Sequence, residues 1–316
     1  MNNSESPFNW RKLIIQALRA PFFTATLAAV FVGSAVAWND GAFRWDLFFI
    51  TLIAAVAVHA GTNVLNDYFD HIFRADDLQE HPTPFSGGSR VIQERKMSPP
   101  MVLWLAIGSY VITVVAGIWL IWLRGWPMLV IGLLGLFLSV EYTAPPLRLA
   151  YRGHGLGELA TGIGFGPIMV VGTYFVQTGA IRPSAVWASL PIGFLIAAVL
   201  YINEFPDYET DREAGKNTIV VVQGPRGAVA GYGAIMLAAY ATIVVGVLSR
   251  LMHWSAFLTF LTLPMTIRAI SLARKYYEQI DQLLPANAAT IQVHSLFGLA
   301  LATSFLLDRV FRLWLA

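Results

Sequence analysis

The sequence predicts an all-α integral membrane protein, a bundle of nine transmembrane helices, from three observations. First, its 316 residues are 56% hydrophobic and only 13% charged, whereas soluble domains carry about 25% charged residues. Second, it contains nine apolar runs long enough to cross a bilayer, which takes about 17–25 residues. Third, the small net charge of +2 conceals a segregation of charge between the two ends of these runs. We expect one transmembrane domain over residues 1–316.

The nine predicted helices follow from their apolar runs, taken in order along the chain. The first begins after the polar stretch MNNSESPFNWRK and lacks a convincing A-x-A cleavage site, so we expect a retained helix and not a signal peptide. The eighth has the weakest pattern, because Arg268 interrupts it. The predicted ranges are 21–38, 46–69, 100–123, 126–142, 156–178, 184–205, 226–249, 254–272 and 292–314.

The connections between these helices predict the orientation of the bundle. Short connections join the third helix to the fourth, the fifth to the sixth and the seventh to the eighth. The long polar loops after helices two, four, six and eight therefore share one side. With the N-terminus on that side, it carries 15 of the 21 Arg and Lys residues. The positive-inside rule then places the N-terminus and these loops in the cytoplasm, and the protein in the cell (inner) membrane.

Composition also excludes several kinds of site. There is no cysteine, which rules out disulfides, thiolate nucleophiles, Fe–S clusters and Cys–Zn sites. The six histidines show no metal-ligand spacing, and we expect no nucleic-acid partner. Gly162, Gly164 and Gly166 follow no strand, so they are interpreted as close helix-packing positions and not as a nucleotide loop.

An acidic motif, NDYFDHIFRADD (66–77), stands at the end of the second predicted helix. Ionisable residues at membrane depth are costly and are usually functional. Because helical residues three or four apart share a face, Asn63, Asp67 and Asp70 form one polar stripe. Asp76 follows in the loop. This end of the helix therefore presents several carboxylates that need a positive partner.

A second motif, YINEFPDYETDREAGKNT (201–218), stands at the end of the sixth predicted helix. Asn203, Asp207 and Asp211 are spaced four residues apart, so we expect a second stripe on one helix face. Lys216 follows it. Both stripes lie on even-numbered helices and face the same side of the membrane, so we interpret them as two halves of one site.

The chemistry of these side chains favours Mg²⁺. Oxygen ligands without Cys or suitably spaced His suit this hard cation, which is commonly held by carboxylates together with substrate phosphates. One acidic helix end alone would be most simply a solvated interfacial patch. A proton or cation pathway in a transporter is a further alternative. That alternative predicts charges near the bilayer midplane and helices broken there, whereas these acids gather at one face.

At these two motifs the chain resembles the UbiA-type superfamily of intramembrane prenyltransferases. NDYFD (66–70) is similar to its first aspartate-rich motif and DYETDREAGKNT (207–218) to its second. The resemblance covers essentially the whole chain. It implies nine helices with cytoplasmic loops after the second and sixth, and transfer of a prenyl group from a polyprenyl diphosphate to an aromatic acceptor, with Mg²⁺.

Within the superfamily the chain is most similar to the 1,4-dihydroxy-2-naphthoate prenyltransferases of menaquinone biosynthesis. Asp76, six residues after Asp70, matches that branch. Arg74 and His154 depart from its pattern, so the acceptor stays open between naphthoate and hydroxybenzoate, homogentisate, a chlorophyllide or a glyceryl phosphate lipid. The other segments that carry the likeness are SGGSRVIQ (86–93), YTAPPLRLAYRGHGLGE (142–158) and GTYFVQTG (172–179).

The resemblance implies a role for each candidate residue. The implied metal ligands are Asp67, Asp70, Asp76, Asp207 and Asp211, with Asn63, Asn66 and Asn203 as supporting ligands or orienting groups. The implied diphosphate-binding residues are Lys216, Arg148 and Arg90. The tyrosines that would flank a prenyl cation with their ring faces are Tyr68, Tyr142, Tyr151 and Tyr201, although each also fits an ordinary packing position.

Two further features have open interpretations. Glu158, just inside the fifth predicted helix, either orients or deprotonates the acceptor or pairs with Arg152, and we favour pairing. The segment EHPTPFSGGSR (80–90) is rich in turn-forming residues. It is either a plain linker or a lid that closes over the diphosphate, with Gly87 and Gly88 as hinges.

Overall fold

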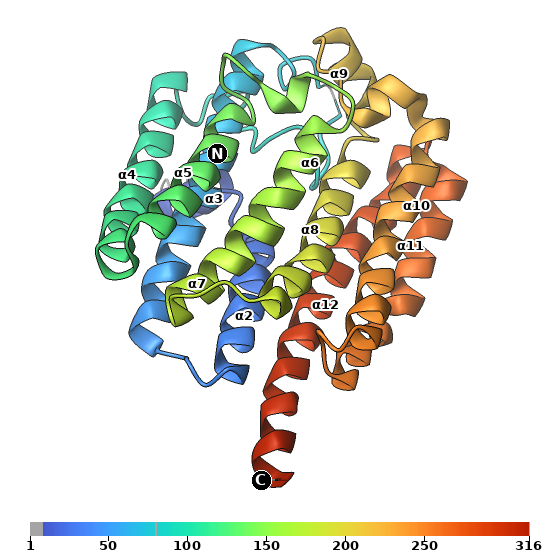
Figure 1. Cartoon of the computed structure of the whole chain (residues 1–316). Helices are drawn as coiled ribbons and strands as arrows, with labels where there is room; N and C mark the ends of the chain where they lie inside the picture. The colour runs from blue at the N-terminus through green and yellow to red at the C-terminus, as the bar shows by residue number, and fades with distance from the viewer. Residues whose placement is uncertain (1–8, 80, 316) are drawn as a thin grey trace, which may run out of the picture.

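The fold consists of helices and their connections throughout the residues described, 9–79 and 81–315, in the computed structural model (Figure 1). Sixteen helical segments occur in that range. The α-helices are α1 (Trp10–Ala17), α2 (Thr24–Asn39), α3 (Trp45–Ile72), α4 (Pro99–Arg124), α5 (Trp126–Glu141), α6 (Leu156–Ile163), α7 (Gly172–Thr178), α8 (Pro183–Asn203), α9 (Tyr208–Glu213), α10 (Ile219–Leu248), α11 (Leu263–Tyr276) and α12 (Ile280–Leu315). The remaining segments are η1 (Ala20–Phe23), η2 (Leu149–Tyr151), η3 (Gly164–Val171) and η4 (Trp254–Thr262).

Eight helical stretches among the described residues are long and apolar enough to cross a membrane. Three of them are composite. η1 with α2 forms the stretch Ala20–Asn39, α6 with the π-helix η3 and α7 forms Leu156–Thr178, and η4 with α11 forms Trp254–Tyr276. The predicted helix that is not among these eight is the fourth, 126–142, which corresponds to α5, an apolar helix of only 16 residues. The predicted range 292–314 begins too late, since α12 starts at Ile280.

Small residues let α8 lie at the centre of the bundle. A Cβ atom added at Gly166 would stand 2.8 Å from the Cα of Gly193 on α8, and one at Gly162 would stand 3.1 Å from the Gly193 carbonyl oxygen. The predicted close-packing role is thus confirmed for these two glycines. It is wrong for Gly164, which faces open space. Tight contact on this side makes α8 the most buried span, whereas α4 is the least buried.

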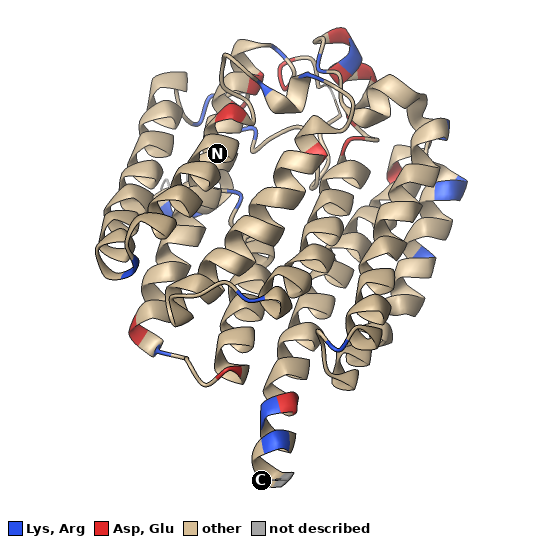
Figure 2. Cartoon of the chain, in the orientation of Figure 1, with Lys and Arg blue, Asp and Glu red and all other residues tan. Residues whose placement is uncertain are grey.

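The long connections 73–98, 142–155 and 204–218 gather at one end of the bundle, the end that carries α9 (Figure 1). Figure 2 shows many acidic and basic residues gathered at the same end. At the opposite end, short turns join α2 to α3 and α4 to α5. The fold therefore brings the two acidic motifs, far apart in the sequence, to one polar end of an apolar bundle.

Candidate active site

The first acidic motif lies on the last turns of α3, as the sequence predicts. No helix-breaking residue interrupts the run before Ile72, so Asn63, Asp67 and Asp70 keep their helical spacing and share a face. Asp67 and Asp70 are each only 3% exposed. The Asn63 amide donates a hydrogen bond to the carbonyl of Leu18 at 3.2 Å, which ties this stripe to the segment before α2.

The second acidic motif is not a single helical stripe, and that prediction is wrong. α8 ends at Asn203, and the chain turns before α9 begins at Tyr208. Pro206 lies in this turn. It interrupts the helix because proline has no N–H to donate and disfavours helical geometry in the residue before it. The Asp211 N–H donates to the Asp207 carbonyl at 2.8 Å. The short α9 thus still places these two aspartates one turn apart.

Lys216 joins the two motifs. Its Nζ lies 3.1 Å from Asp70 Oδ2 and 3.6 Å from Asp211 Oδ1. Burial alone would lower the pKa of Lys216, but Asp211 and Asp70 outweigh it and hold that pKa well above its ordinary value. Burial raises the pKa of Asp211 to about 8, although Lys216 opposes this. The Tyr151 hydroxyl donates to the other Asp70 oxygen at 2.6 Å.

The connection after α3 crosses both motifs. Gln79 donates to Asp207 Oδ1 at 2.6 Å, and the Gly87 N–H donates to Asp207 Oδ2 at 3.3 Å. Two residues on, the Ser89 N–H lies 3.2 and 3.3 Å from the two Asp67 oxygens. Gly87 has φ of +78° and Gly88 of +71°, a region that favours glycine. This segment therefore covers the acidic residues directly.

The Asp76 carboxylate lacks the hydrogen-bond donors and ion-pair partners that the neighbouring aspartates have. It is 6% exposed, and no donor in the described part of the chain bonds its carboxylate. Burial, with Asp70 and Asp67 adding to it, raises the pKa of Asp76 well above its usual range. The Arg90 guanidinium bonds only the Asp76 backbone carbonyl, at 2.6 Å. A buried carboxylate among carboxylates needs a cation, so this arrangement has the chemistry of a divalent-metal site.

The donor set fits Mg²⁺ by its chemistry. Its oxygens come from five aspartates, of which Asp70 and Asp211 contact the Lys216 ammonium group, and no softer ligand accompanies them. Within the described residues, no three acidic or histidine side chains converge on a single metal position. Lys216, Gln79 and the backbone N–H groups of Gly87 and Ser89 bond the carboxylates of Asp70, Asp207, Asp211 and Asp67 instead. The carboxylates are gathered but are held by the protein's own donors.

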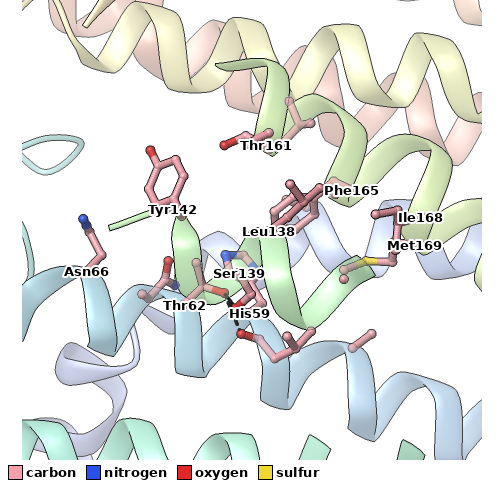
Figure 3. Close-up of a pocket in the computed structure, with 18 of the residues that line it drawn as sticks. His59, Thr62, Asn66, Leu138, Ser139, Tyr142, Thr161, Phe165, Ile168 and Met169 are labelled. Atoms are coloured by element: carbon pink, nitrogen blue, oxygen red, sulfur yellow. Dashed lines mark hydrogen bonds between the residues drawn. The ribbon is translucent and has the colours of Figure 1, made fainter. Parts of the chain in front are cut away.

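A cavity of about 500 Å³ adjoins this cluster. Lys216, Asp70 and Asp207 line its polar end, and mostly apolar side chains line the rest. Figure 3 shows Asn66, Thr62 and His59 along the α3 wall, with Tyr142 and Thr161 across from them. Asn203 also lines the cavity. The polar cluster thus opens into a space suited to an apolar molecule with one charged end.

Several predicted site residues lie elsewhere. Tyr68 packs in a cluster with α4, and Tyr201 is fully buried against α10; neither lines the cavity. The Arg148 guanidinium lies over the rings of Phe73 at 3.6 Å and Tyr151 at 4.3 Å. Arg148 therefore supports the tyrosine that bonds Asp70 and does not line the cavity itself.

The expected pair between Glu158 and Arg152 does not form, and the preference for it is wrong. Arg152 donates to the carbonyls of Leu147 and Pro146. Glu158, 5% exposed, accepts from the Ile219 N–H at 3.2 Å. Its charge instead raises the pKa of the buried Glu204, after the larger effect of burial.

Sequence reasoning missed Arg19, Thr62, Ser139 and His59, which also line the cavity. His59 was detectable in principle, because it precedes Asn63 by four residues and so extends the same helical stripe. Thr62 and Ser139 were not, since their hydroxyls meet at 2.5 Å across two helices. Such a contact depends on tertiary packing and leaves no local pattern.

Comparison with known proteins gives consistent results. The sequence profile of the UbiA prenyltransferase family matches residues 26–305. The chain is 28% identical to the 1,4-dihydroxy-2-naphthoate octaprenyltransferase of Bacillus subtilis, covering 94% of this chain and 93% of that one. It is also 28% identical to the 2-carboxy-1,4-naphthoquinone phytyltransferase of Synechocystis, covering 93% of each.

The fold is similar to a solved structure as well. A UbiA homolog from Archaeoglobus fulgidus, bound to GPP and Mg²⁺, aligns with a TM-score of 0.59 over 92% of this chain and 99% of that one. Their sequences are 14% identical. The likeness covers nearly the full length of both chains, so the helical bundle is the shared feature.

Proposed function

The chain belongs to the UbiA prenyltransferase family, and on that premise we propose that it transfers a prenyl group from a polyprenyl diphosphate to 1,4-dihydroxy-2-naphthoate, with Mg²⁺, in menaquinone biosynthesis. The names of two relatives that match over most of their length support this acceptor class, because each refers to a naphthoate or naphthoquinone acid. The GPP and Mg²⁺ bound to the archaeal homolog support the donor and the metal.

One observation carries the proposal: two distant acidic motifs meet around Lys216 at the mouth of an apolar cavity. A prenyl diphosphate has the matching shape, with a polyanionic head and a hydrocarbon tail. A soluble anion would need no apolar cavity, and a transported cation would need a path through the bundle. The carboxylates instead gather at one end of the cavity.

The metal would be held by Asp67, Asp70, Asp76, Asp207 and Asp211. When bound, Mg²⁺ neutralises the charge that develops on the departing diphosphate. Lys216 supplies a permanent positive charge at the same place, since its pKa is held well above its ordinary value. Tyr151 fixes one oxygen of Asp70 and so orients that carboxylate.

The protein then has to keep water from the allylic carbon while the aromatic ring attacks it. The apolar lining of the cavity excludes water. Tyr142 lines the cavity next to the polar end, where its ring face can stabilise positive charge on the prenyl carbon. Gln79, Gly87 and Ser89 cover the acidic residues from the loop side, as the lid interpretation of this segment requires.

The active site is proposed to face the cytoplasm in the cell membrane. Eight of the 21 Arg and Lys residues fall in the connections 73–98, 142–155 and 204–218, at the end of the bundle that carries α9. The positive-inside rule associates such an end with the cytoplasm. Soluble aromatic acids and diphosphates made in the cytoplasm would then reach the site directly.

The test is turnover by the purified protein in detergent, with Mg²⁺, a labelled prenyl diphosphate and a panel of acceptors. We expect prenylated naphthoate and released diphosphate, and loss of both when EDTA removes the metal. If product forms only with hydroxybenzoate, homogentisate, a chlorophyllide or a glyceryl phosphate lipid, that compound replaces naphthoate as the proposed acceptor. No product with any acceptor, together with ion-driven uptake in proteoliposomes, would refute the enzyme.

A further inference from the structure

We propose that two buried imidazoles, His59 and His294, bind the oxygen substituents of the aromatic acceptor inside the cavity. The inference rests on the proposed function, because it assumes an oxygen-bearing aromatic acceptor. It goes beyond that function by assigning the acceptor a place: the wall formed by α2, α3, η3 and α12. Both histidines line the same cavity as Lys216 and Asp70.

The cavity walls differ in chemistry. The side formed by α4 and α5 contributes chiefly apolar groups such as Val114, Ile118, Leu129 and Leu133. The wall formed by α2, α3, η3 and α12 contributes the two imidazoles. An isoprenoid tail has no hydrogen-bonding group and is accommodated by the first wall. A hydroxylated aromatic acid needs donors, and the second wall supplies them.

Thr26 fixes which nitrogen of His59 carries the proton. Thr26 is fully buried, and its hydroxyl lies 2.8 Å from His59 Nδ1. Within the described residues, the Thr26 hydroxyl makes no other hydrogen bond. We therefore assign the Thr26 hydroxyl as the donor to Nδ1, because the reverse direction would leave this buried O–H without an acceptor. The proton of the neutral ring is then on Nε2, which acts as a donor.

Two aromatic rings hold His59 in place. Phe23 and Phe165 meet it edge-on, with ring centroids at 5.3 and 4.8 Å. The imidazole is thus fixed by one hydrogen bond and two ring contacts, which leaves Nε2 as its free polar atom. Such a group is preorganised to bind an oxygen atom and loses little freedom when it does.

His294 adds an independent observation. It is 1% exposed, and its Nε2 has no hydrogen-bond partner within the described residues. A buried polar nitrogen without a partner is unfavourable unless a ligand supplies one. Ile291, one turn earlier on α12, packs in the same cluster as Phe165, the ring that contacts His59. The two imidazoles therefore approach the same part of the cavity.

The position along α3 fits an acceptor below the diphosphate. His59 precedes Asp67 by eight residues, which is about 12 Å along a helix. Asn66, Thr62 and His59 follow one another along this wall (Figure 3). An aromatic ring that meets the allylic carbon near the acidic cluster would direct its outer oxygen toward His59. The imidazoles would then set both the depth and the orientation of the ring.

The experiment measures acceptor and donor affinities separately in His59→Leu and His294→Leu. For each variant, the KM for naphthoate and the KM for prenyl diphosphate are determined with Mg²⁺. The Kd for naphthoate is determined by equilibrium dialysis without metal. We expect the acceptor KM and Kd to rise roughly tenfold, as for one lost hydrogen bond, while the donor KM changes less than about twofold.

Two controls separate binding from folding. His154→Leu makes the same change at an exposed position and should alter neither constant. Thr26→Val removes the hydroxyl that fixes the His59 tautomer and should weaken acceptor binding, whereas Thr26→Ser should restore it. Because Thr26 is a positioning residue, this rescue distinguishes orientation of the ring from a general packing defect. Melting temperatures in detergent identify any variant that fails to fold.

The outcomes are distinct. Unchanged acceptor constants in both histidine variants, with normal turnover by the wild type, would overturn this inference and leave the proposed function intact. A rise in the donor KM instead of the acceptor KM would also overturn it, because the imidazoles would then contact the prenyl chain. No wild-type turnover with any acceptor would refute the proposed function itself.

Discussion

At the scale of single residues, the site is a problem of charge compensation. Asp67, Asp70 and Asp211 are almost fully buried, and Asp76 has no donor among the described residues. Lys216 alone contacts two of these carboxylates from opposite motifs. The donors to these carboxylates and to that of Asp207 therefore include one ammonium group, the Tyr151 hydroxyl, the Gln79 amide and the backbone N–H groups of Gly87 and Ser89.

The first prediction concerns the two halves of the site. Asp67→Asn and Asp207→Asn each remove one carboxylate charge, and with it one proposed metal ligand, while keeping side-chain size. We expect either change to lower kcat by roughly 100-fold or more, because charge stabilisation in the transition state is lost. Turnover assays with saturating substrates test this, with melting temperature as the folding control. Near-normal activity in either variant removes that residue from the site.

The second prediction concerns Lys216→Met. Breaking a buried ion pair leaves unpaired charges and costs about 3–5 kcal/mol. We expect a marked fall in the metal-free melting temperature in detergent, partly reversed by millimolar Mg²⁺, since the cation would replace the lost ammonium group. Lys275→Met, at a lysine that makes no ion pair with a described acid, is the matched control. Equal effects of the two changes would contradict the central role of Lys216.

At the scale of elements, the sequence predicted α3 well and the second motif less well. The stripe on α3 was predictable because an unbroken helical pattern carries Asp67 and Asp70 to its end. The stripe across Asn203 and Asp207 was predicted wrongly because it was inferred from spacing alone, although Pro206, which is visible in the sequence, already indicated a local distortion of the helix there. The sequence still allowed the inference that the two motifs meet in space, because they end the second and sixth predicted helices, and even-numbered helices in that order end on the same side of the membrane.

Long-range partners were beyond reach of the sequence. Glu158 was expected to pair with a nearby arginine, but it bonds a backbone N–H sixty-one residues away. Gln79 reaches Asp207 across 128 residues. Such contacts follow from helix packing, and the local sequence around each residue does not predict them.

The third prediction concerns Gly88, in the connection after α3 that covers the acidic residues. A Cβ there would overlap the Asp76 carboxylate and come within 3.2 Å of Asp67. We expect Gly88→Ala to lower kcat at least tenfold, since the loop could no longer lie against the acids. Gly224→Ala is the control, because Gly224 also has positive φ but has open space around it. Similar losses in both variants would attribute the effect to backbone strain alone.

At the scale of the whole molecule, apolar helices surround the polar cluster, and the charged groups gather at one end of the bundle.

The fourth prediction concerns Glu204. Its burial, and then the nearby Glu158 carboxylate, raise the pKa of Glu204 well above its ordinary value of 4.5. The unfolded chain releases this proton near pH 4.5, whereas the folded chain keeps it to higher pH. Stability therefore falls as pH rises through that interval.

Replacing Glu204 with Gln removes this titration. We expect Glu204→Gln to be more stable than the wild type at high pH and nearly equal near pH 4.5. Melting temperatures across this pH range, in detergent with EDTA, provide the test. An identical pH profile for the two proteins would show that Glu204 is not held protonated by its surroundings.

The fifth prediction concerns orientation. The chain contains no cysteine, so single cysteines can be introduced without a background. We expect Arg182→Cys, at the end opposite α9, to react with an impermeant maleimide added to intact spheroplasts. Glu209→Cys, on α9, should react only after permeabilisation. The reverse pattern would place the acidic cluster outside the cytoplasm.

The short helix α5 has a consequence for the surrounding lipid. Its 16 residues span about 24 Å, less than the roughly 30 Å of a typical hydrocarbon core. Such a mismatch is commonly met by local thinning of the bilayer. α5 lines the substrate cavity, so the headgroup layer beside it would dip toward the active site. A lipid-borne diphosphate arriving along α5 would then have less depth to travel than elsewhere on the protein.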